Sequence, residues 1–554
     1  MSINDHRLVQ CNEKDEETLL IFKKGINDSY NGKISTWSTK KDCCAWEGVS
    51  CDNITGRVTE LDLKQHFLEG EMNMSILKLE FLSYLDLSFN EFDVIRIPSI
   101  QDNITHTSNL LYLDLSFNSY VSSLSLAWLS AHSSLKYLNL SGIDLHKETN
   151  LLQAVNTLPS LLELHLSECN LNNFITNPFM EYLNLSSLLT LDLSKNNFSS
   201  QLPNQFFNQT KDLTYLDLSW NNIHGSIPHS WKNMKYLDYI NLWSNKLSGE
   251  ALVHLSGWKQ LRIMNLGENE FSGTIPINMS QILKVVILRA NQFEGNIPTQ
   301  IFNLSYLFHL DLADNKLSGS IPKSVYNLTQ MIKFTMNDRT MAVVELFTKG
   351  QEYEVQQIET NRQTIDLSAN YLSGEVPSEL FHLVQLQTLN LSRNNLIGTI
   401  PKIIGGMKNL ESLDLSNNKL CGEIPQSMSL LNFLEYLNIS YNNFNGKIPT
   451  GTQLQSFNAS SYIGNPKLCG APLENCNIKE QNPKTPTTSM KNEDGDSIRE
   501  SLYLGMGVGF AAGFWGICGS LFLIRKWRHA YFRFVDGVGD KLNVTLMVKL
   551  NRFH

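Results

Sequence analysis

The chain has 554 residues, of which 42% are hydrophobic and 18% charged, which fits a folded protein with several domains or one long repeat array. Its formal net charge of −9 argues against nucleic acid as the main partner, because phosphate binding requires a basic face. Leucine and asparagine recur at fixed spacing, so internal repeats are the first feature to define.

The amino-terminal segment, residues 1–56, contains an expected helix and a cluster of cysteines. The helical stretch is Glu16–Ile26, with apolar residues at Leu19, Leu20, Phe22 and Ile26. The cysteines are Cys11, Cys43, Cys44 and Cys51, and a second cluster near the other end of the array holds Cys469 and Cys476. Two clusters that flank a cysteine-poor middle indicate disulfide-bonded caps in an oxidising compartment. The spacing and the lack of nearby histidines argue against zinc.

A repeat of about 24 residues follows, with the pattern Leu-x-Leu-x-x-Asn. Its sixth position falls at His66, Asn90, Asn118, Ile143, Cys169, Asn196, Asn221, Asn245, Asn269, Asn291, Asn315, Asn370, Asn394, Asn418 and Asn442. This gives fifteen units, and we expect each to place a short strand on the concave side of a solenoid with its leucines directed inward. The asparagine amide is expected to satisfy backbone groups in the turn. At this position Cys169 is expected to be a buried structural thiol.

A second signature follows the asparagine in eight units. It begins at Gly225, Gly273, Gly295, Gly319, Gly374, Gly398, Gly422 and Gly446, each followed by x-Ile-Pro or x-Val-Pro. Glycine permits the turn, and proline fits an edge where no amide donor is needed. This form resembles the plant-specific leucine-rich repeat, and the chain is similar to the plant leucine-rich-repeat receptor-like proteins. The resemblance implies an α/β solenoid, a right-handed curved superhelix with a parallel β-sheet on its concave face.

The same resemblance gives the organisation of both ends of the array. Residues 1–56 look like the family's amino-terminal cap, which implies pairing of Cys44 with Cys51 and of Cys11 with Cys43, although the sequence by itself leaves the connectivity open. Residues 57–330 are expected to form units 1–11 and residues 362–457 units 12–15. Residues 458–480 form the carboxyl-terminal cap, closed by Cys469 and Cys476.

Residues 331–361 interrupt the repeat with a polar, charged insertion that contains Lys349 and Tyr353. Its position, four units before the end, resembles the island domain of the receptor-like proteins. Long insertions in compact arrays are functional or unstructured. Both interpretations stay open here, a tolerated surface loop and a contact for a ligand or co-receptor.

After an acidic linker at 481–501, residues 502–524 form an uncharged stretch long enough to span a bilayer. Basic residues follow at once, which predicts a cytoplasmic tail at 525–554 and a single-pass type I protein of the plasma membrane. Gly505, Gly509 and Gly513 recur every fourth residue, a spacing that lets a second helix approach. The alternative is a merely glycine-rich anchor. In the family, the equivalent glycines help to hold an adaptor receptor kinase.

Asn-x-Ser/Thr sites precede the expected span, as a secreted surface would require. They are Asn27, Asn53, Asn73, Asn103, Asn139, Asn184, Asn197, Asn208, Asn278, Asn303, Asn327, Asn390, Asn438 and Asn458. Residues 1–10 carry no apolar signal core, whereas family members begin with one. Two explanations are open: the gene model starts too late, or this copy is defective. The capped, glycosylatable ectodomain favours the first explanation.

Ligand contacts are expected on the concave face, where exposed strand positions carry an aromatic run. Its members are Tyr84, Phe89, Tyr112, Phe117, Tyr137, Tyr215, Trp220, Tyr239 and Trp243. Aromatic residues often anchor recognition, but they also stack between neighbouring repeats and stabilise a sheet. Arg262, Arg289 and Arg393 add cationic positions, of which Arg289 is the most notable, beside the shortest unit. The selected ligand-binding candidates are Tyr215, Trp220, Tyr239, Trp243, Arg289, Lys349 and Tyr353.

No catalytic constellation or kinase motif is present, so we expect neither an enzyme nor a cofactor or metal site. The sequence favours a cell-surface receptor-like protein that binds an extracellular peptide, protein or glycan, with a pathogen-derived or peptide ligand favoured, and that signals through adaptor and co-receptor leucine-rich-repeat receptor kinases. One alternative is an inhibitor of secreted microbial wall-degrading enzymes. Another is a truncated, non-functional receptor copy.

Overall fold

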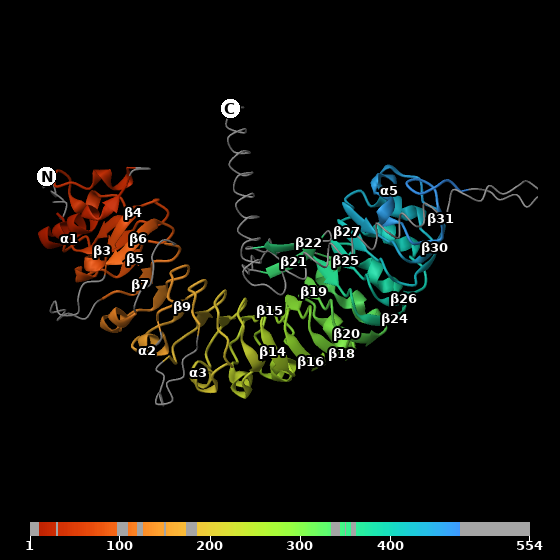
Figure 1. The fold of residues 1–554 in the computed structure, drawn as a ribbon, viewed down its shortest axis with the longest axis horizontal. Coiled ribbons are helices and arrows are strands. Elements are labelled where there is room, and N and C mark those ends of the chain that lie inside the picture. The colour runs from red at the N-terminus through yellow and green to blue at the C-terminus, as the bar shows by residue number, and fades with distance from the viewer. Residues whose placement is uncertain are drawn as a thin grey trace, which may run out of the picture. The chain divides into compact units, whose positions relative to one another are not determined.

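The computed structural model describes residues 10–28, 32–96, 109–118, 126–148, 151–172, 185–333, 344–348, 351–355 and 362–476 (Figure 1). The chain divides into two compact units, Met1–Cys476 and Asn477–His554. The described residues all belong to the first unit, which is a solenoid. The expected linker, span and tail therefore lie outside the described residues.

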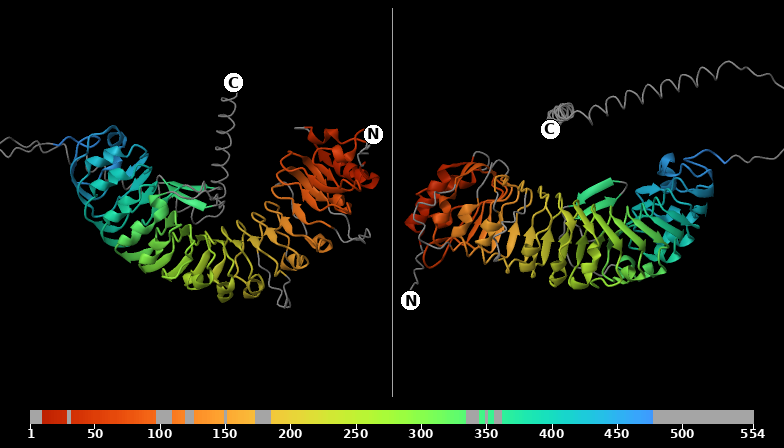
Figure 2. Two further views of the ribbon diagram at one scale, coloured as in Figure 1. Left: turned by 180° about the vertical axis from the view of Figure 1, so that it is seen from behind. Right: turned by 60° about the horizontal axis from the view of Figure 1, so that its bottom comes forward.

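One long sheet lines the concave face of the solenoid (Figures 1 and 2). Among the described residues its parallel strands are β3 (Val58–Asp62), β5 (Tyr84–Asp86), β7 (Tyr112–Asp114), β8 (Tyr137–Asn139), β9 (Glu163–His165), β10 (Thr190–Asp192), β11 (Tyr215–Asp217), β13 (Tyr239–Asn241), β15 (Ile263–Asn265), β17 (Val285–Ile287), β19 (His309–Asp311), β23 (Thr364–Asp366), β25 (Thr388–Asn390), β27 (Ser412–Asp414) and β29 (Tyr436–Asn438). Each central residue pairs with the central residue of the next strand, as Leu191 does with Leu216. The predicted solenoid with a parallel concave sheet is confirmed.

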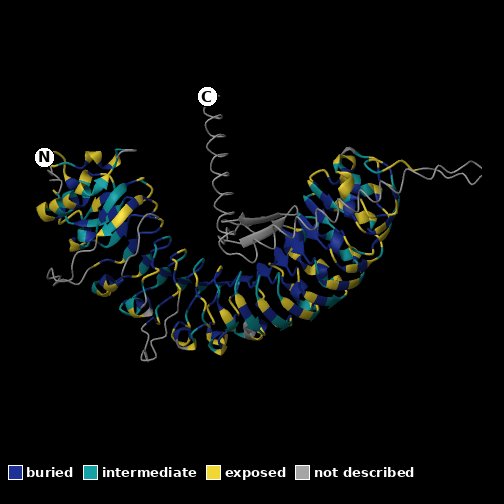
Figure 3. Cartoon of the chain, viewed as in Figure 1, coloured by how far each residue is buried: buried dark blue, intermediate teal, exposed yellow. Residues whose placement is uncertain are grey.

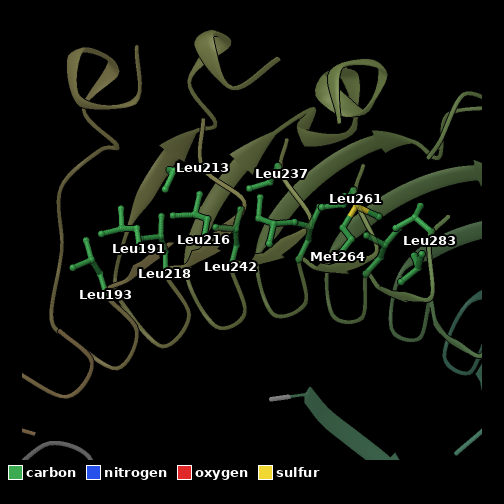
Figure 4. Close-up of a cluster of buried hydrophobic side chains, with 14 of the residues drawn as sticks. Leu191, Leu193, Leu213, Leu216, Leu218, Leu237, Leu242, Leu261, Met264 and Leu283 are labelled. Carbon is green, nitrogen blue, oxygen red and sulfur yellow. The ribbon is translucent and has the colours of Figure 1, made fainter. Parts of the chain in front are cut away.

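Apolar residues, mostly leucines, alternate with the outward residues along each strand, and these inward side chains form a continuous core (Figures 3 and 4). Leu216 and Leu218, for example, are 0% exposed and pack between the equivalent leucines of the neighbouring units. Burial of one such side chain stabilises the fold by about 1.5–3 kcal/mol. Since no unit can bury this face alone, the core depends on stacking of neighbours.

Where the sixth position is asparagine, its amide connects the unit to the preceding one. Asn221 donates from Nδ2 to the carbonyls of Leu193, Leu218 and Ser219 at 3.0–3.1 Å. Its Oδ1 accepts from the Phe198 amide at 3.1 Å. The expected role of the amide is therefore confirmed.

The asparagine series has three substitutions, at His66, Ile143 and Cys169, and one extension. Cys169 is fully buried, its Sγ lies 3.2 Å from the Leu140 carbonyl, and burial raises the pKa of the thiol, as expected for a structural cysteine. Asn465 continues the series into the carboxyl-terminal cap, with its Nδ2 3.0 Å from the Ile439 carbonyl. The search pattern missed Asn465 because the cap lacks the two leucines.

Short strands and 3-10 helices complete the turns on the other side of each unit. A seven-stranded sheet is formed by β12 (His224–Ser226), β14 (Lys246–Gly249), β16 (Glu270–Thr274), β18 (Gln292–Asn296), β20 (Lys316–Gly319), β24 (Tyr371–Glu375) and β26 (Asn395–Ile397). A three-stranded sheet follows with β28 (Cys421–Glu423), β30 (Asn443–Lys447) and β31 (Lys467–Cys469). The signature glycines lie in or beside these strands at positive φ, 84° at Gly225, and six of the eight signature prolines precede 3-10 helices.

The remaining helices fall at the caps and on the convex side. The α-helices are α1 (Glu13–Lys24), α2 (Leu151–Asn156), α3 (Asn204–Gln209), α4 (Thr329–Ile332) and α5 (Thr452–Ser456). The 3-10 helices are η1 (Lys33–Thr36), η2 (Cys43–Ala45), η3 (Met74–Lys78), η4 (Ala127–Ala131), η5 (His229–Asn233), η6 (Ala251–Gly257), η7 (Thr299–Asn303), η8 (Lys323–Asn327), η9 (Ser378–His382), η10 (Lys402–Gly406), η11 (Gln426–Leu430) and η12 (Ala459–Ser461).

The amino-terminal cap closes the core with a helix, an antiparallel strand and two disulfides. β2 (Val49–Cys51) pairs antiparallel with β3, while β1 (Ile26–Asn27), β4 (Glu69–Asn73) and β6 (Glu91–Arg96) form a small separate sheet. Cys11 pairs with Cys43 and Cys44 with Cys51, the pairing that the resemblance implied, and Cys469 pairs with Cys476 in the other cap. The buried Asp15 carboxylate lies 2.9 Å from Nε of Arg57, which joins α1 to the first unit.

The insertion leaves the concave sheet intact. β19 pairs directly with β23, with His309 opposite Thr364, although 52 positions of the sequence lie between β19 and β23. Two antiparallel strands, β21 (Val344–Thr348) and β22 (Gln351–Val355), form a hairpin within the insertion. Met331, inside the expected insertion, is fully buried and its carbonyl accepts from Gln385, so the packed core extends past residue 331.

Candidate recognition surface on the concave sheet

The outward side chains of the concave strands fall into three rows, because residues of a strand alternate between its two faces and the strands are in register. In unit 7 the first row holds Tyr215, the second Asp217 and the third Ser219. A turn residue at positive φ follows the third row, and in this unit it is Trp220. The same four positions in the other units form the candidate surface.

The first row near the amino-terminal cap is a series of stacked rings. Tyr84 and Tyr112 lie with ring centroids 4.3 Å apart, Tyr112 and Tyr137 4.2 Å, and Tyr137 and His165 5.4 Å. This spacing follows from the 4.7–4.9 Å distance between adjacent strands. Burial between neighbouring rings raises the pKa of Tyr137 to about 12. For these tyrosines, stacking between repeats is therefore confirmed, while a role in recognition stays a prediction.

The turn residues of the same region are exposed. Phe89 and Phe117 stack with centroids 4.7 Å apart and are 48% and 36% exposed. Trp220 is 44% exposed. All three lie after their strands at φ of 53–55°, not in the strands as expected. Their rings are therefore accessible, as are those of Tyr441 at the same turn position and of Phe67, two positions further along its own turn.

The second row is mostly acidic, and its carboxylates also shape the turns. Asp217 accepts from the Ser219 amide and hydroxyl at 2.9 and 2.6 Å. It also accepts from the Tyr239 hydroxyl at 3.2 Å. Burial and the nearby carboxylate of Asp192 raise the pKa of Asp217. A ligand that brings a neutral or cationic group to this row would be favoured over an anionic one, because it would not add to the negative charge.

The centre of the concave face is different, because several of its outward positions carry apolar, buried side chains. Tyr239, Trp243, Ile263, Val285, Ile287 and Phe308 form one cluster, against which Tyr215 packs. Tyr239 and Trp243 are only 4% and 2% exposed, so the expectation that they are exposed is wrong. The β21–β22 hairpin lies on this side of the array, near β19 (Figures 1 and 2).

Several polar atoms in this central region are buried without hydrogen-bond partners. They are Nε1 of Trp243, both ring nitrogens of His309, Oε1 of Gln363, Oγ1 of Thr364 and Oγ of Ser368. Burial lowers the pKa of His309 to about 4, so the imidazole is neutral. Buried polar groups are normally paired, and their concentration on β19, β23 and the adjacent turns marks this part of the face as unusual.

Arg289, in the third row, lies between two buried carboxylates. Its Nη1 is 3.3 Å from Asp311 and 3.4 Å from Asp366, and its side chain is 13% exposed. Burial and the Asp366 charge raise the pKa of Asp311, and Arg289 opposes that rise. Sequence analysis singled out Arg289 but missed its partners and His309. A comparison of the outward positions in register would have shown the change from tyrosine and aspartate to Ile263, Val285 and Ile287 beside the insertion.

The remaining predicted sites are only partly within the described residues. Tyr353 lies in β22, whereas Lys349, Gly505, Gly509 and Gly513 lie outside. Among the helices that the structure describes, none has the length and apolar character needed to cross a membrane.

The sequons fall into two groups. Eight asparagines are exposed: Asn27, Asn53, Asn197, Asn208, Asn278, Asn303, Asn327 and Asn458. Three others lie in the second row of the sheet, where the Nδ2 atoms of Asn139, Asn390 and Asn438 donate to aspartates of the preceding units. Asn73 is half-buried, and Asn103 and Asn184 lie outside the described residues.

Comparisons with known proteins agree with this architecture. The family described as "Leucine rich repeat N-terminal domain" matches residues 12–52, and families described as "Leucine rich repeat" match residues 186–247, 306–328 and 385–444. Receptor-like protein EIX1 of Solanum lycopersicum is 34% identical over 267 residues, which cover 41% of this chain and 26% of that protein. Receptor-like protein 6 of Arabidopsis thaliana is 30% identical over 274 residues, 41% of this chain and 27% of that protein.

A solved structure with the same architecture is that of a TDR receptor, with a TM-score of 0.57 and 28% identity over 73% of this chain and 68% of that one. The match to each of the two receptor-like proteins spans about a quarter of its length. With its cap, repeats and relatives taken together, the chain is similar to the plant leucine-rich-repeat receptor-like proteins.

Proposed function

We propose that the chain is a cell-surface receptor-like protein whose concave face binds an extracellular ligand. The observation that carries this proposal is the uninterrupted concave sheet, on which exposed aromatic residues stand beside an acidic row and an inserted hairpin. Curved repeat arrays use such extended concave surfaces for binding. Relatives named as receptor-like proteins support the same assignment.

The ligand contact is proposed for the side of the hairpin that faces the amino-terminal units. There Trp220 is exposed and Tyr215 is partly accessible, whereas Tyr239 and Trp243 are buried beneath their neighbours. A rigid aromatic residue supplies a large contact area at low entropic cost, which is typical of binding hot spots. The acidic second row favours a ligand, of peptide, protein or glycan type, that presents a neutral or cationic face. Lys349 and Tyr353 of the insertion would contact it from the other side.

Signalling is proposed to require partner kinases, since the sequence shows no kinase motif. The last units, about residues 410–450, would meet a co-receptor ectodomain. The glycine-rich segment at 502–524 would span the plasma membrane and contact the helix of an adaptor kinase. Small residues at this spacing permit close helix packing.

The ligand-binding part can be tested by cross-linking. The full chain, expressed in plant cells with a secretory leader, is exposed to fractionated peptides and proteins of plant extracellular fluid and of a pathogen culture filtrate. A specific ligand should cross-link to it, and Trp220→Ala should reduce the yield roughly tenfold or more, because loss of an aromatic anchor costs about 2 kcal/mol. The matched control is Tyr371→Ala, since Tyr371 is 62% exposed on β24, away from the concave sheet. Equal yields from the two variants, or no selective cross-link, would refute the proposed contact.

The partner part has a separate test. Replacement of Gly505, Gly509 and Gly513 by leucine should weaken co-precipitation with an adaptor receptor kinase while ligand cross-linking is retained. Unchanged co-precipitation would count against the helix contact without affecting the ligand site.

A further inference from the structure

A pocket of about 350 Å³ lies on the side of the array opposite the concave sheet, between α3 and η5. Pockets that hold small ligands begin at about 300 Å³, so this one has room for a single small molecule. Its wall includes Phe207 and Asn208 of α3, Ser230 of η5, and the segment that leads into β13. Nothing in the proposed receptor function uses it.

The base of the pocket is a fixed aromatic cluster. Phe207 is 1% exposed and its ring packs edge-on against Phe206 at 5.0 Å and Trp231 at 4.9 Å. Trp231 is held in turn by Trp258, whose indole nitrogen donates to the Trp231 carbonyl at 2.8 Å. Because these rings belong to the buried core, the pocket does not depend on a movable loop for its base.

The rim of the pocket offers both hydrogen-bond donors and hydrogen-bond acceptors. Lys211 and Lys235 supply donors, Asp212 supplies acceptors, and Asn233 supplies both. The Ser230 hydroxyl is buried and has no hydrogen-bond partner. This mixture fits a molecule with several hydroxyl or amide groups, because such groups can donate to Asp212 and accept from the two lysines.

Tyr236 gives the rim an exposed aromatic ring. It is 59% exposed, and it lines the pocket beside Lys235. A flat ring at the edge of a polar pocket matches the C–H face of a sugar ring, which is apolar, while the sugar's hydroxyls remain free to bond with the charged rim.

The pocket is lined by a residue that can carry a sugar covalently. Asn208, Gln209 and Thr210 form an acceptor sequence for N-linked glycans, and Asn208 is both exposed and part of the pocket wall. Thr210 is 0% exposed and its hydroxyl lies 3.3 Å from the Phe206 carbonyl, so the sequon is fixed to the aromatic base. A sugar attached to Asn208 would therefore be held beside the pocket at very high effective concentration.

We propose that this pocket holds the first N-acetylglucosamine of a glycan attached to Asn208, with its ring against Tyr236 and its acetamide and hydroxyls on the polar rim. The proposal requires passage through the secretory pathway, as the proposed function does, but it requires no receptor ligand. It makes the inner sugar of this glycan a fixed part of the convex surface.

The test compares Asn208 with Asn278, an exposed sequon in the loop before β17. The full chain is expressed with a secretory leader in plant cells treated to keep glycans in the high-mannose form, and occupancy is read by glycopeptide mass spectrometry. Endoglycosidase H, which cleaves next to the first sugar, is then applied to the folded protein. Cleavage at Asn208 should be at least fivefold slower than at Asn278, and Tyr236→Ala should remove most of that difference. Tyr371→Ala, which removes an exposed tyrosine elsewhere, should leave it unchanged.

Each outcome separates the two proposals. Cleavage of both glycans at the same rate in the wild-type protein, or occupancy of Asn278 without occupancy of Asn208, overturns the pocket proposal and leaves the receptor proposal intact. Absence of glycans at every sequon overturns the extracellular location and, with it, both proposals. If cleavage at Asn208 stays slow in Tyr236→Ala, the double variant Asp212→Ala, Lys235→Ala is measured next. Slow cleavage in that variant as well would refute a sugar held in the pocket.

Discussion

The amino-terminal and central parts of the concave sheet have the same backbone and opposite surfaces. From β5 to β8 the outward rows are stacked tyrosines and hydrogen-bonded carboxylates, with Phe89 and Phe117 exposed beyond them. From β13 to β19 several positions of the same rows carry apolar, buried side chains, with Val285 and Ile287 at 0% exposure. The difference teaches that register fixes the position of a side chain in this fold, while the residues around that position determine whether the side chain meets solvent.

The largest expected effect that tests this comparison is at Trp243. Trp243→Ala should lower the free energy of unfolding by about 3–5 kcal/mol, because it opens a cavity in the buried central cluster. The measurement is denaturant unfolding of the full chain. Trp220→Ala is the control, since Trp220 is exposed and should cost far less. Equal losses would show that the central face is no second core.

The next effect concerns the ion-paired arginine. Arg289→Ala should cost about 2–4 kcal/mol at neutral pH, because it leaves Asp311 and Asp366 buried without their cation. The loss should shrink on acidification, since the carboxylates can then take up protons. The exposed Arg393→Ala is the control, and a loss that is independent of pH would contradict the pairing.

A smaller effect should appear at His309 as a dependence on pH. Its pKa is lowered to about 4 by burial, whereas the unfolded chain retains the ordinary value of 6.5. The folded state therefore binds fewer protons, and stability is lost as the pH falls from 6.5 towards 4. At pH 4.5 this loss should be on the order of 2 kcal/mol. In His309→Gln, the difference in the free energy of unfolding between pH 7 and pH 4.5 should be smaller by this amount. An unchanged difference would mean that the imidazole meets water in the folded protein.

The smallest effect belongs to the amino-terminal tyrosines. Tyr112→Ala should cost about 1 kcal/mol, the scale of cross-strand aromatic pairs. Tyr112→Phe retains the ring and should cost less. A loss as large as that of Trp243→Ala would show that the tyrosine series is a core element, and the contrast between the two regions would fail.

The sequence predicted the architecture well because the repeat carries its own physical explanation. The spacing of Leu216, Leu218 and Asn221 fixes a strand, an inward face and a turn, and the structure confirms all three. Exposure was harder to predict, since Tyr239 occupies the same pattern position as Tyr215 but is buried in the central cluster. Trp243 lies in the third row, one position before the turn residue that corresponds to Trp220, and it is buried as well. The partners of Arg289 were also missed, because Asp366 lies 77 positions away and becomes adjacent only through the pairing of β19 with β23.

That pairing has a consequence for how such a protein can vary. Since β19 and β23 are neighbours whatever lies between them, the ends of the insertion stay in place when its length changes. Doubling a flexible loop costs only about 0.6 kcal/mol of closure entropy, which is less than the loss of one buried leucine. Replacement of this one segment can therefore change which side chains border the concave face without repacking any repeat. Recognition and folding can then evolve on separate segments of the same chain.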